Sequence, residues 1–415
     1  MKHRDAYRAY LTIEGFFALF FYMIVTVNLV YQVEVAKLNP LQLVLVGTVL
    51  ETACFLCQVP TGIFADVYSR RLSIIIGIFL TGAGFILEGS FPRFDIILFS
   101  QIGWGVGSTF ISGAEEAWIA EEVGEENVGK VFLRGAQVSQ LGALIGAVIS
   151  VALASIRVNL PIVLGGGLIL LLGVYLLLFM PEHSFHGTSQ NATRERPTWK
   201  TMSKTVFESG RLVRGSPLLI TLLCLAAFYG MASEGFDRLW VAHLLLDITL
   251  PTLGPLNSVV WFGIIRGGVM IFSIIVAESI RRFIDTSRHK TVSRLLFIIN
   301  ALQIVSMIIF GLAGNFALAL AAYWSVSILR QTNNPIYTAW LAQNIDAKVR
   351  ATVISMSGQL DAIGQIAGGP IIGVIGTLVS IRAALVATAA LLSPTLLLFV
   401  RADSQGKKVD VEIVE

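Results

Sequence analysis

Long apolar runs follow one another along almost the whole chain, and they constrain its fold more than any other feature. A helix that crosses a membrane needs roughly 20 apolar residues, because each residue rises about 1.5 Å through a hydrocarbon core about 30 Å thick. Twelve membrane-spanning helices are predicted, near residues 11–33, 41–64, 72–91, 95–119, 132–156, 160–180, 217–245, 257–280, 292–312, 316–342, 350–378 and 381–400. The sequence therefore predicts an all-α membrane protein.

The charged residues are few and unevenly placed. They make up 14% of the chain, against about a quarter in soluble domains, so lipid is the expected solvent. Lys37, Arg93, Arg157 and Arg382 lie in loops predicted on the outer side, whereas most of the 30 lysine and arginine residues fall on the opposite side. By the positive-inside rule, both termini are predicted to be cytoplasmic. The net charge of +3 gives no indication of a nucleic-acid partner.

A repeated segment divides the chain into two similar halves. Residues 117–120 (AWIA) end the fourth predicted span and residues 339–342 (AWLA) end the tenth, and each is followed by a short polar loop. Such self-similarity is typical of transporters built from two repeats. The predicted organisation is an N-terminal six-helix bundle at 1–181, a cytoplasmic linker at 182–215, a C-terminal six-helix bundle at 216–402 and a cytoplasmic tail at 403–415.

The loop between the second and third spans carries a specific pattern. Gly62, Asp66, Arg70 and Arg71 combine a small residue for close helix approach, an acid that can pair with a cation, and two cations for the anionic membrane surface. This spacing resembles the signature loop of the major facilitator superfamily, where it acts in gating. The resemblance implies the major facilitator fold, with two pseudo-symmetric six-helix bundles that open alternately to each side of the membrane.

Five further segments resemble the drug:proton antiporter branch of this superfamily, which contains tetracycline- and macrolide-type exporters of bacteria. They are residues 10–15 (YLTIEG), 28–32 (NLVYQ), 47–51 (GTVLE), 112–120 (SGAEEAWIA) and 233–240 (SEGFDRLW). The resemblance implies a small-molecule substrate, protons as the coupling ion, and efflux of amphipathic drugs by alternating access. It also implies a multi-pass protein of the bacterial plasma (inner) membrane.

Some positions depart from the usual antiporter pattern. In the signature loop, Val67 replaces a basic residue and Ser69 replaces a glycine. Gln101 occupies the position where many antiporters carry an arginine in the fourth span. Gly142 and Gly146 favour close helix packing in the fifth span, but the proline and paired glycines that usually follow are missing. A proton pathway is therefore expected to use other residues.

Acidic residues within the spans are the candidates for that pathway, because a charge at the centre of a membrane helix costs roughly 2.5–3.5 kcal/mol or more. Glu51 lies on the second span with Thr48 on its face, and Asp361 lies on the eleventh span with Ser357 and Gln365 one turn away. Both polar stripes are expected to face a central cavity. Burial would allow these carboxyl groups to bind and release a proton near neutral pH.

The seventh span carries the densest charged cluster. Glu234, Asp237 and Arg238 are spaced so that all three can meet on one helix face. One interpretation is an ion pair within the helix that neutralises Arg238. The other makes Glu234 or Asp237 part of a proton or cation site at the cavity.

Further polar residues are predicted to line the substrate cavity: Glu14, Asn28, Tyr31, Gln32, Glu115, Arg238, Arg330 and Gln365. For Glu14, pairing with Arg8 or Arg134 at the membrane surface is an alternative. Glu115 and Glu116 are adjacent, so at most one of them is expected to face the cavity. For Arg330, a structural salt bridge to an acid of a neighbouring helix is the favoured alternative.

Other chemistries lack support in the sequence. It contains no Walker-type phosphate loop, Ser-His-Asp arrangement or His-rich cluster, so we expect neither an enzyme nor a catalytic residue, metal or cofactor. We expect a monomer in the lipid bilayer. Two alternatives to drug efflux are export of an endogenous metabolite or siderophore, and lipid transport or sensing on the same scaffold.

Overall fold

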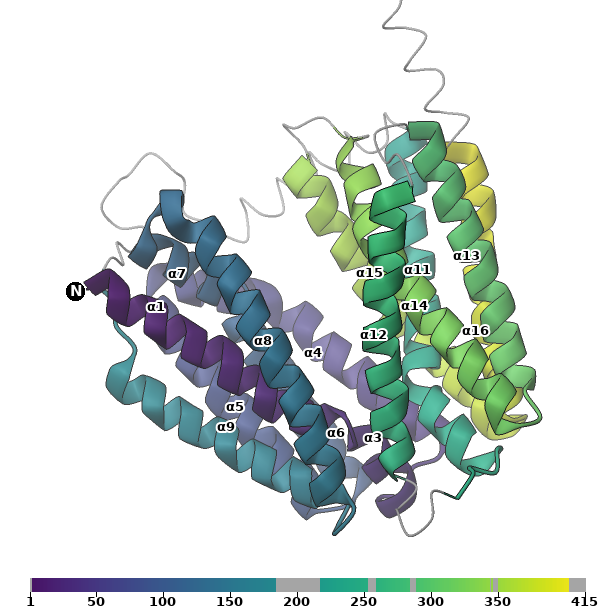
Figure 1. The fold of residues 1–415 in the computed structure, drawn as a ribbon, viewed down its shortest axis with the longest axis horizontal. Helices are drawn as coiled ribbons and strands as arrows, with labels where there is room; N and C mark the ends of the chain where they lie inside the picture. Colours follow the sequence, from purple (N-terminus) through teal and green to yellow (C-terminus); the bar gives the residue numbers. More distant parts are fainter. Residues whose placement is uncertain are drawn as a thin grey trace, which may run out of the picture. The chain divides into compact units, whose positions relative to one another are not determined.

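The protein is seen in a computed structural model that describes residues 2–183, 217–252, 259–283, 289–343, 345 and 350–402 (Figure 1). These residues form helices joined by short loops, and none of them lies in a strand. The predicted all-α fold is therefore confirmed. The predicted linker, beyond its first two residues, and the predicted tail at 403–415 lie outside the described residues.

The helices follow the predicted spans in chain order. The first half forms α1 (Lys2–Thr12), η1 (Ile13–Phe17), α2 (Ala18–Val25), α3 (Asn28–Val30), η2 (Tyr31–Val35), α4 (Pro40–Val67), α5 (Arg70–Ser90), α6 (Phe94–Ile111), α7 (Ala114–Val123), α8 (Glu125–Ala154) and α9 (Leu160–Phe179). The second half forms α11 (Pro217–Leu246), α12 (Val259–Phe283), α13 (His289–Leu312), α14 (Phe316–Gln343), α15 (Arg350–Leu378) and α16 (Ile381–Leu392).

Ten helical stretches among the described residues are long and apolar enough to cross a membrane. The two predicted spans outside this group are α12 and α14. The first of them contains a shorter apolar stretch, Val259–Ser273. The second is 28 residues long, and its middle carries Arg330, Asn333 and Asn334, which lower its hydropathy. These polar residues face a cavity that is described below.

Two of the predicted spans are interrupted. The first runs from Asp5 to Val35 but passes through two π-helical segments, η1 and η2. The fourth is divided between α6 and α7 at Gly113, whose φ of 77° is readily adopted only by glycine. Short π-helical segments inside α-helices are frequent at functional sites. Here η1 carries Glu14 and η2 carries Gln32, two of the predicted site residues.

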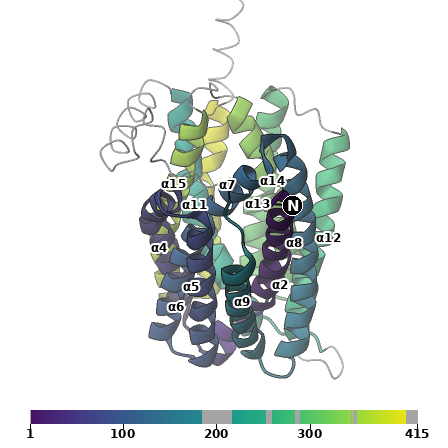
Figure 2. The ribbon, with the colours of Figure 1, turned by 90° about the vertical axis from the view of Figure 1, so that its left-hand side faces the viewer.

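The described chain divides into two compact units. Unit 1 comprises residues 2–38, 49–183, 252 and 259–263, and unit 2 comprises residues 39–48, 217–251, 264–283, 289–343, 345 and 350–402. Within unit 1, α2 packs on α8 and α9, and α5 packs on α6 and α9 (Figure 2). Within unit 2, α11 packs on α15 and α16, and α13 packs on α14 and α16. Corresponding spans of the two halves thus form the same four pairs, and the internal repeat extends from sequence to packing.

Glycines allow equivalent close approaches in both units. Gly142 and Gly146 of α8 lie against backbone carbonyls of η1 and α2. Gly364 and Gly368 of α15 lie against backbone carbonyls of α11. A Cβ atom at any of these four positions would collide with backbone, which cannot move without displacing a whole helix. The predicted packing role of the glycines in the fifth span is therefore confirmed.

The repeated tryptophans anchor the cores of the two units. Trp118 and Trp340 are among the largest fully buried side chains. The indole Nε1 of Trp118 donates a hydrogen bond of 2.8 Å to the carbonyl oxygen of Pro181. In unit 2, Trp340 packs in a cluster with Leu222 and Phe399. Trp118 and Trp340, the repeated tryptophans, consequently have a packing role in their units.

Candidate functional site

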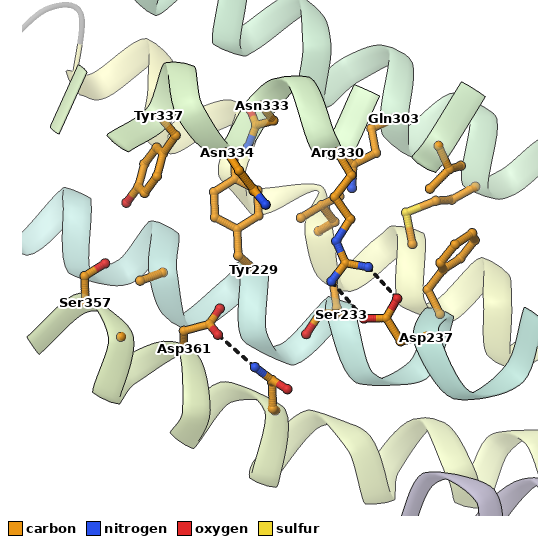
Figure 3. A pocket seen from close by; sticks show the side chains of 18 residues that line it. Tyr229, Ser233, Asp237, Gln303, Arg330, Asn333, Asn334, Tyr337, Ser357 and Asp361 are labelled. Atoms are coloured by element: carbon orange, nitrogen blue, oxygen red, sulfur yellow. Dashed lines mark hydrogen bonds and ion pairs between the residues drawn. The ribbon is translucent and has the colours of Figure 1, made fainter. Parts of the chain in front are cut away.

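Unit 2 encloses a cavity of about 390 Å³ between α11, α13, α14 and α15 (Figure 3). Helix α11 contributes Tyr229, Ser233 and Asp237, α13 contributes Gln303, α14 contributes Arg330, Asn333, Asn334 and Tyr337, and α15 contributes Ser357, Asp361 and Gln365. The lining therefore combines hydroxyl, amide and charged groups with the aromatic rings of two tyrosines. Such a lining suits a ligand that has both apolar and hydrogen-bonding parts.

A salt bridge in this cavity joins α11 and α14. Arg330 Nη1 lies 2.6 Å from Asp237 Oδ1, and Arg330 Nη2 lies 2.8 Å from Asp237 Oδ2. This two-bond geometry is the preferred pairing of a guanidinium with a carboxylate. The salt bridge that was predicted for Arg330 is thus present, and the same arginine also lines the cavity.

A second carboxylate lies in the same cavity on α15. Asp361 accepts a hydrogen bond of 2.8 Å from Gln365 Nε2, one turn along its own helix. Ser357, one turn in the other direction, also lines the cavity. All three residues of this polar stripe thus line one cavity within unit 2. The cavity brings two carboxylates and one guanidinium together.

Buried amides hold one wall of the cavity in place. The hydroxyl of Tyr229 donates to Asn300 Oδ1 over 2.8 Å and accepts from Asn333 Nδ2 over 3.2 Å. Asn300 Nδ2 in turn donates to Asn333 Oδ1 over 3.1 Å. The three side chains come from α11, α13 and α14, so this ring fixes the spacing of three helices around the cavity.

Within the charged cluster of α11, Glu234 and Arg238 form the ion pair that one of the two interpretations expected, and Asp237 is not part of it. Arg238 Nε pairs with Glu234 Oε1 at 2.8 Å, and both side chains are largely buried. This pair lies against Gly47 at the start of α4, where the space that a Cβ would need is taken by the Glu234 carboxylate. The side chain of Asp237 instead points toward Arg330, and each of its two carboxylate oxygens accepts one hydrogen bond from the guanidinium. Neither Glu234 nor Arg238 lines the cavity of unit 2.

Unit 1 contains a second cavity, of about 590 Å³, and three carboxylates line it. They are Glu14 from η1 and both Glu115 and Glu116 from α7. Tyr10, which also lines the cavity, donates a hydrogen bond of 2.9 Å to Glu14 Oε1. The alternative pairing of Glu14 with Arg8 or Arg134 is not seen among the described contacts, where Arg134 binds Gln137 instead.

The expectation that only one of Glu115 and Glu116 faces a cavity is wrong. The two side chains do point in different directions on α7, but the cavity extends around the start of this helix, where Ser112 and Gly113 also line it. Both acids lie in the first turn of α7. The partial positive charge of a helix N-terminus also favours acidic residues at these positions.

The predicted cavity residues of η2 and α3 face elsewhere. Asn28, Tyr31 and Gln32 are buried inside unit 1 and line neither described cavity. Gln32 Nε2 donates to Glu88 Oε1 over 2.8 Å, and the Tyr31 hydroxyl donates to the backbone carbonyl of Glu88 over 2.7 Å. The Tyr31 and Gln32 side chains of η2 thus point toward α5.

Sequence reasoning missed Glu88 altogether. Its side chain is 0% exposed and accepts hydrogen bonds from three neighbouring residues. An acid inside a run of apolar residues is itself a signal of function. Glu88 lies in the last turn of its predicted span, where an acid is ordinarily assigned to the membrane surface. Its burial follows from packing against α6 and η2, which the sequence pattern does not show.

The signature loop forms a network of contacts within unit 1. Arg70 pairs with Asp66 at 3.5 Å and with Glu121 at 2.6 Å. Arg71 donates to the carbonyl oxygen of Leu177 near the end of α9. Both guanidinium groups thus bind protein groups, whereas the sequence interpretation had placed them at the lipid surface. The loop ties the ends of α4, α5, α7 and α9 together.

Two details of that loop differ from expectation. Ser69 caps α5 by accepting from the backbone N–H of Leu72, and its hydroxyl donates to Glu182 over 2.7 Å. A serine in place of the usual glycine is therefore used for capping. At Gly62, a Cβ would meet no heavy atom within 4 Å among the described residues, so the predicted close helix approach is not made there.

Glu51 is half-buried on α4 and lines neither described cavity. The described residues contain no group of three or more His, Cys, Asp or Glu side chains that could hold a metal ion. The Sγ atom of Cys54 lies 3.4 Å from the hydroxyl of Ser108, and Cys54, Cys57 and Cys224 are free thiols.

Comparisons with known proteins bear on this arrangement. The sequence profile of the Major Facilitator Superfamily matches residues 11–356. An uncharacterized MFS-type transporter of Bacillus subtilis, YxaM, is 24% identical over 363 residues, which cover 86% of each chain.

Solved structures also resemble the chain in fold. A bacterial homolog of the human lysosomal transporter Spinster has a TM-score of 0.70 at 14% identity, covering 98% of both chains. The nucleoside transporter NupG has a TM-score of 0.72 at 12% identity, covering 95% of this chain and 99% of its own. A peptide transporter of the POT family has a TM-score of 0.73 at 15% identity, covering 97% of this chain and 95% of its own.

Proposed function

The chain belongs to the Major Facilitator Superfamily, and from this premise we propose that it is a proton-coupled exporter of amphipathic drugs that carry a basic amine. Membership makes it a multi-pass membrane protein and a secondary transporter of small molecules, not an enzyme. Protons as the coupling ion, drugs as the substrate and export as the direction are our proposal. We place it in the bacterial plasma membrane as a monomer with both termini in the cytoplasm.

The observation that carries this proposal is the Asp237–Arg330 ion pair beside Asp361 in one cavity. A guanidinium with two carboxylates within one cavity has two alternative partners. A proton that binds Asp237 removes the charge that holds Arg330, and the arginine then turns to Asp361. Such a change of partner couples protonation to the spacing of α11, α14 and α15, because each of the three residues comes from a different helix.

The acidic cavity of unit 1 supports a cationic substrate. Glu14, Glu115 and Glu116 gather negative charge around 590 Å³ of space, and an amine would offset the repulsion among them. The tyrosines of the unit 2 cavity provide flat apolar surface for the rest of an amphipathic compound. A protonated amine and an aromatic or macrocyclic body are what tetracycline- and macrolide-like drugs combine.

The test is uphill transport of a fluorescent basic dye into inside-out vesicles under an imposed proton gradient. In the wild type, we expect accumulation that collapses when the gradient is dissipated. In Asp361→Asn, Arg330 loses its second partner, so accumulation should fall to the level of empty vesicles while downhill exchange of the dye continues. Asp95→Asn is the matched control, because Asp95 is a surface acid paired with Arg93.

Two outcomes would contradict the proposal. Accumulation that persists without a proton gradient would remove the proton as coupling ion. Unchanged uphill transport by Asp361→Asn would remove Asp361 from the coupling mechanism.

Export of an endogenous metabolite or siderophore is the second candidate, and the amide-rich wall of the unit 2 cavity favours it. Asn334 and Gln303 offer hydrogen bonds that a largely apolar drug would leave unpaired. In a deletion strain, a native compound that accumulates inside the cell without any gain in drug sensitivity would favour this candidate over the first.

A further inference from the structure

A buried carboxylic acid in unit 1 lies apart from both cavities. Glu88 is two residues from the end of α5, and its side chain is 0% exposed. Its Oε1 accepts from Gln32 Nε2 over 2.8 Å, and its Oε2 accepts from Ser100 Oγ over 2.8 Å and from Gln101 Nε2 over 2.9 Å. These donors come from η2 and α6, so three elements converge on one carboxyl group.

The hydrogen-bond donors around Glu88 are a hydroxyl and two amides, which suit either protonation state of the acid. Tyr31, the titratable residue of η2 that contacts it, donates to the backbone carbonyl of Glu88. Near Glu88, the elements that pack on α5 carry three charged residues: Glu34 in η2, and Arg93 and Asp95 at the start of α6. All three side chains are exposed, and Arg93 and Asp95 pair with each other. Helix α9 carries no Asp, Glu, His, Lys or Arg from Leu160 to Phe179.

Ser100 can serve both the ionised and the protonated form. Its hydroxyl lies 2.8 Å from Glu88 Oε2 and 3.0 Å from the carbonyl oxygen of Ile97. When Glu88 is ionised, the serine donates to the carboxylate. When Glu88 is protonated, the serine hydroxyl can donate to the carbonyl oxygen of Ile97, and its oxygen can accept a hydrogen bond from the O–H of Glu88. The exchange needs only a rotation about the Cβ–Oγ bond.

The side-chain amides of Gln32 and Gln101 can also bind Glu88 in either protonation state. Gln32 Oε1 and Gln101 Oε1 are buried and have no hydrogen-bond partner in the described structure. A buried acceptor without a partner costs free energy, so a native site that keeps two of them calls for an explanation. Turning either amide by half a rotation presents its oxygen to Glu88, and a protonated Glu88 can then donate to it. The cluster thus has unused acceptors that a proton on Glu88 would satisfy.

We propose that Glu88 is a proton-binding site of unit 1, in which Gln32, Ser100 and Gln101 stabilise both the ionised and the protonated carboxyl group. In the step, an O–H bond of a hydronium ion breaks, an O–H bond forms on the Glu88 carboxylate and a water molecule is left; no covalent bond of the protein breaks. The site consists of the Glu88 carboxyl group and the three side chains that donate to it, and its ligand is a proton. The inference does not depend on the proposed drug export, because the titration occurs without substrate.

Infrared difference spectroscopy on the full chain in lipid nanodiscs tests this site directly. Between acidic and alkaline pH, we expect the carbonyl stretch of a protonated, water-excluded carboxylic acid to appear and disappear, and carbon-13 glutamate to shift it. Glu88→Gln should abolish the band. Glu34→Gln, which removes an exposed acid of the neighbouring η2, should leave it unchanged.

Two further variants keep the test decisive even when Glu88→Gln fails to fold. Ser100→Ala removes one donor to the carboxylate, so the band should persist to higher pH than in the wild type. Gln101→Arg places a guanidinium beside Glu88, which should hold the acid ionised and remove the band. A band that survives in folded Glu88→Gln or Gln101→Arg overturns the assignment. So does a wild-type spectrum without any such band at every pH at which the protein stays folded.

Discussion

At the scale of single residues, the interaction energy of the Asp237–Arg330 ion pair can be measured with a double-mutant cycle. Each side chain is between a third and a half exposed to the cavity, so the pair is screened and worth about 1 kcal/mol rather than the several kcal/mol of a dry pair. We expect Asp237→Asn and Arg330→Gln each to lower the free energy of unfolding by about that amount. The double variant should lose less than the sum of the two.

Thermal unfolding of the purified variants in one detergent gives the comparison. Arg93→Gln is the control, because the Arg93–Asp95 pair is exposed at the surface, with side chains 70% and 61% exposed. Strict additivity of Asp237→Asn and Arg330→Gln would mean that the two residues do not stabilise each other in the native protein.

Sequence reasoning identified Asp237, Arg330 and Asp361 as functional candidates, because charges inside apolar spans are rare and costly. It could not assign their partners. Asp237 has a cation one residue away in Arg238, yet it binds Arg330 on another helix. The spacing along one helix shows which residues of that helix can pair with each other. Pairing with a residue of another helix depends on how the helices pack, which the spacing does not show. The same limit explains why Asn28, Tyr31 and Gln32 were placed at the cavity although they turn toward Glu88.

At the scale of helices, the glycines of α8 provide a test of packing with an internal control. In Gly146→Ala, the new methyl group meets the backbone of α2, so we expect a loss of about 1–3 kcal/mol of stability from overpacking. Gly62→Ala fills open space on α4 and should be neutral or stabilising by up to about 1 kcal/mol, because alanine favours the helix.

The corresponding glycines of unit 2 extend this test. Gly368→Ala should resemble Gly146→Ala, since it meets the α11 backbone in the equivalent helix pair. Unfolding temperatures in detergent measure all three variants. A Gly146→Ala protein as stable as Gly62→Ala would show that α2 and α8 do not approach as closely in solution as they do here.

Helices were easier to predict than their interruptions. The apolar runs located nearly every helix to within a few residues, because the thickness of the membrane sets their length. The division at Gly113 and the π-helical segments of the first span were missed, since neither interrupts the hydrophobic pattern. Four of the predicted site residues lie at these interruptions: Glu115 and Glu116 follow Gly113 and line one cavity, and Tyr31 and Gln32 of η2 bind Glu88 of α5.

At the scale of the whole molecule, the repeat gives the two units the same helix pairs but different chemistry. Unit 1 has a cavity with three acids, whereas the cavity of unit 2 balances two acids against Arg330. A duplicated scaffold therefore keeps its packing glycines and tryptophans while its polar residues diverge. This division suits a transporter, because packing residues keep each half stable during transport while the polar residues bind the substrate.

The direction of transport depends on the orientation of the chain, which can be measured with single cysteines. Basic residues predict that the loop after α4 is cytoplasmic and that the loop between α15 and α16 is outside. Tyr68 and Val379 mark these loops, with side chains 69% and 72% exposed. In a chain whose Cys54, Cys57 and Cys224 are replaced by alanine, a membrane-impermeant thiol reagent applied to intact cells should label Val379→Cys and spare Tyr68→Cys. Both cysteines should react once the membrane is permeabilised. Labelling of Tyr68→Cys but not of Val379→Cys in intact cells would show that the chain has the opposite orientation, with the loop after α4 outside the cell.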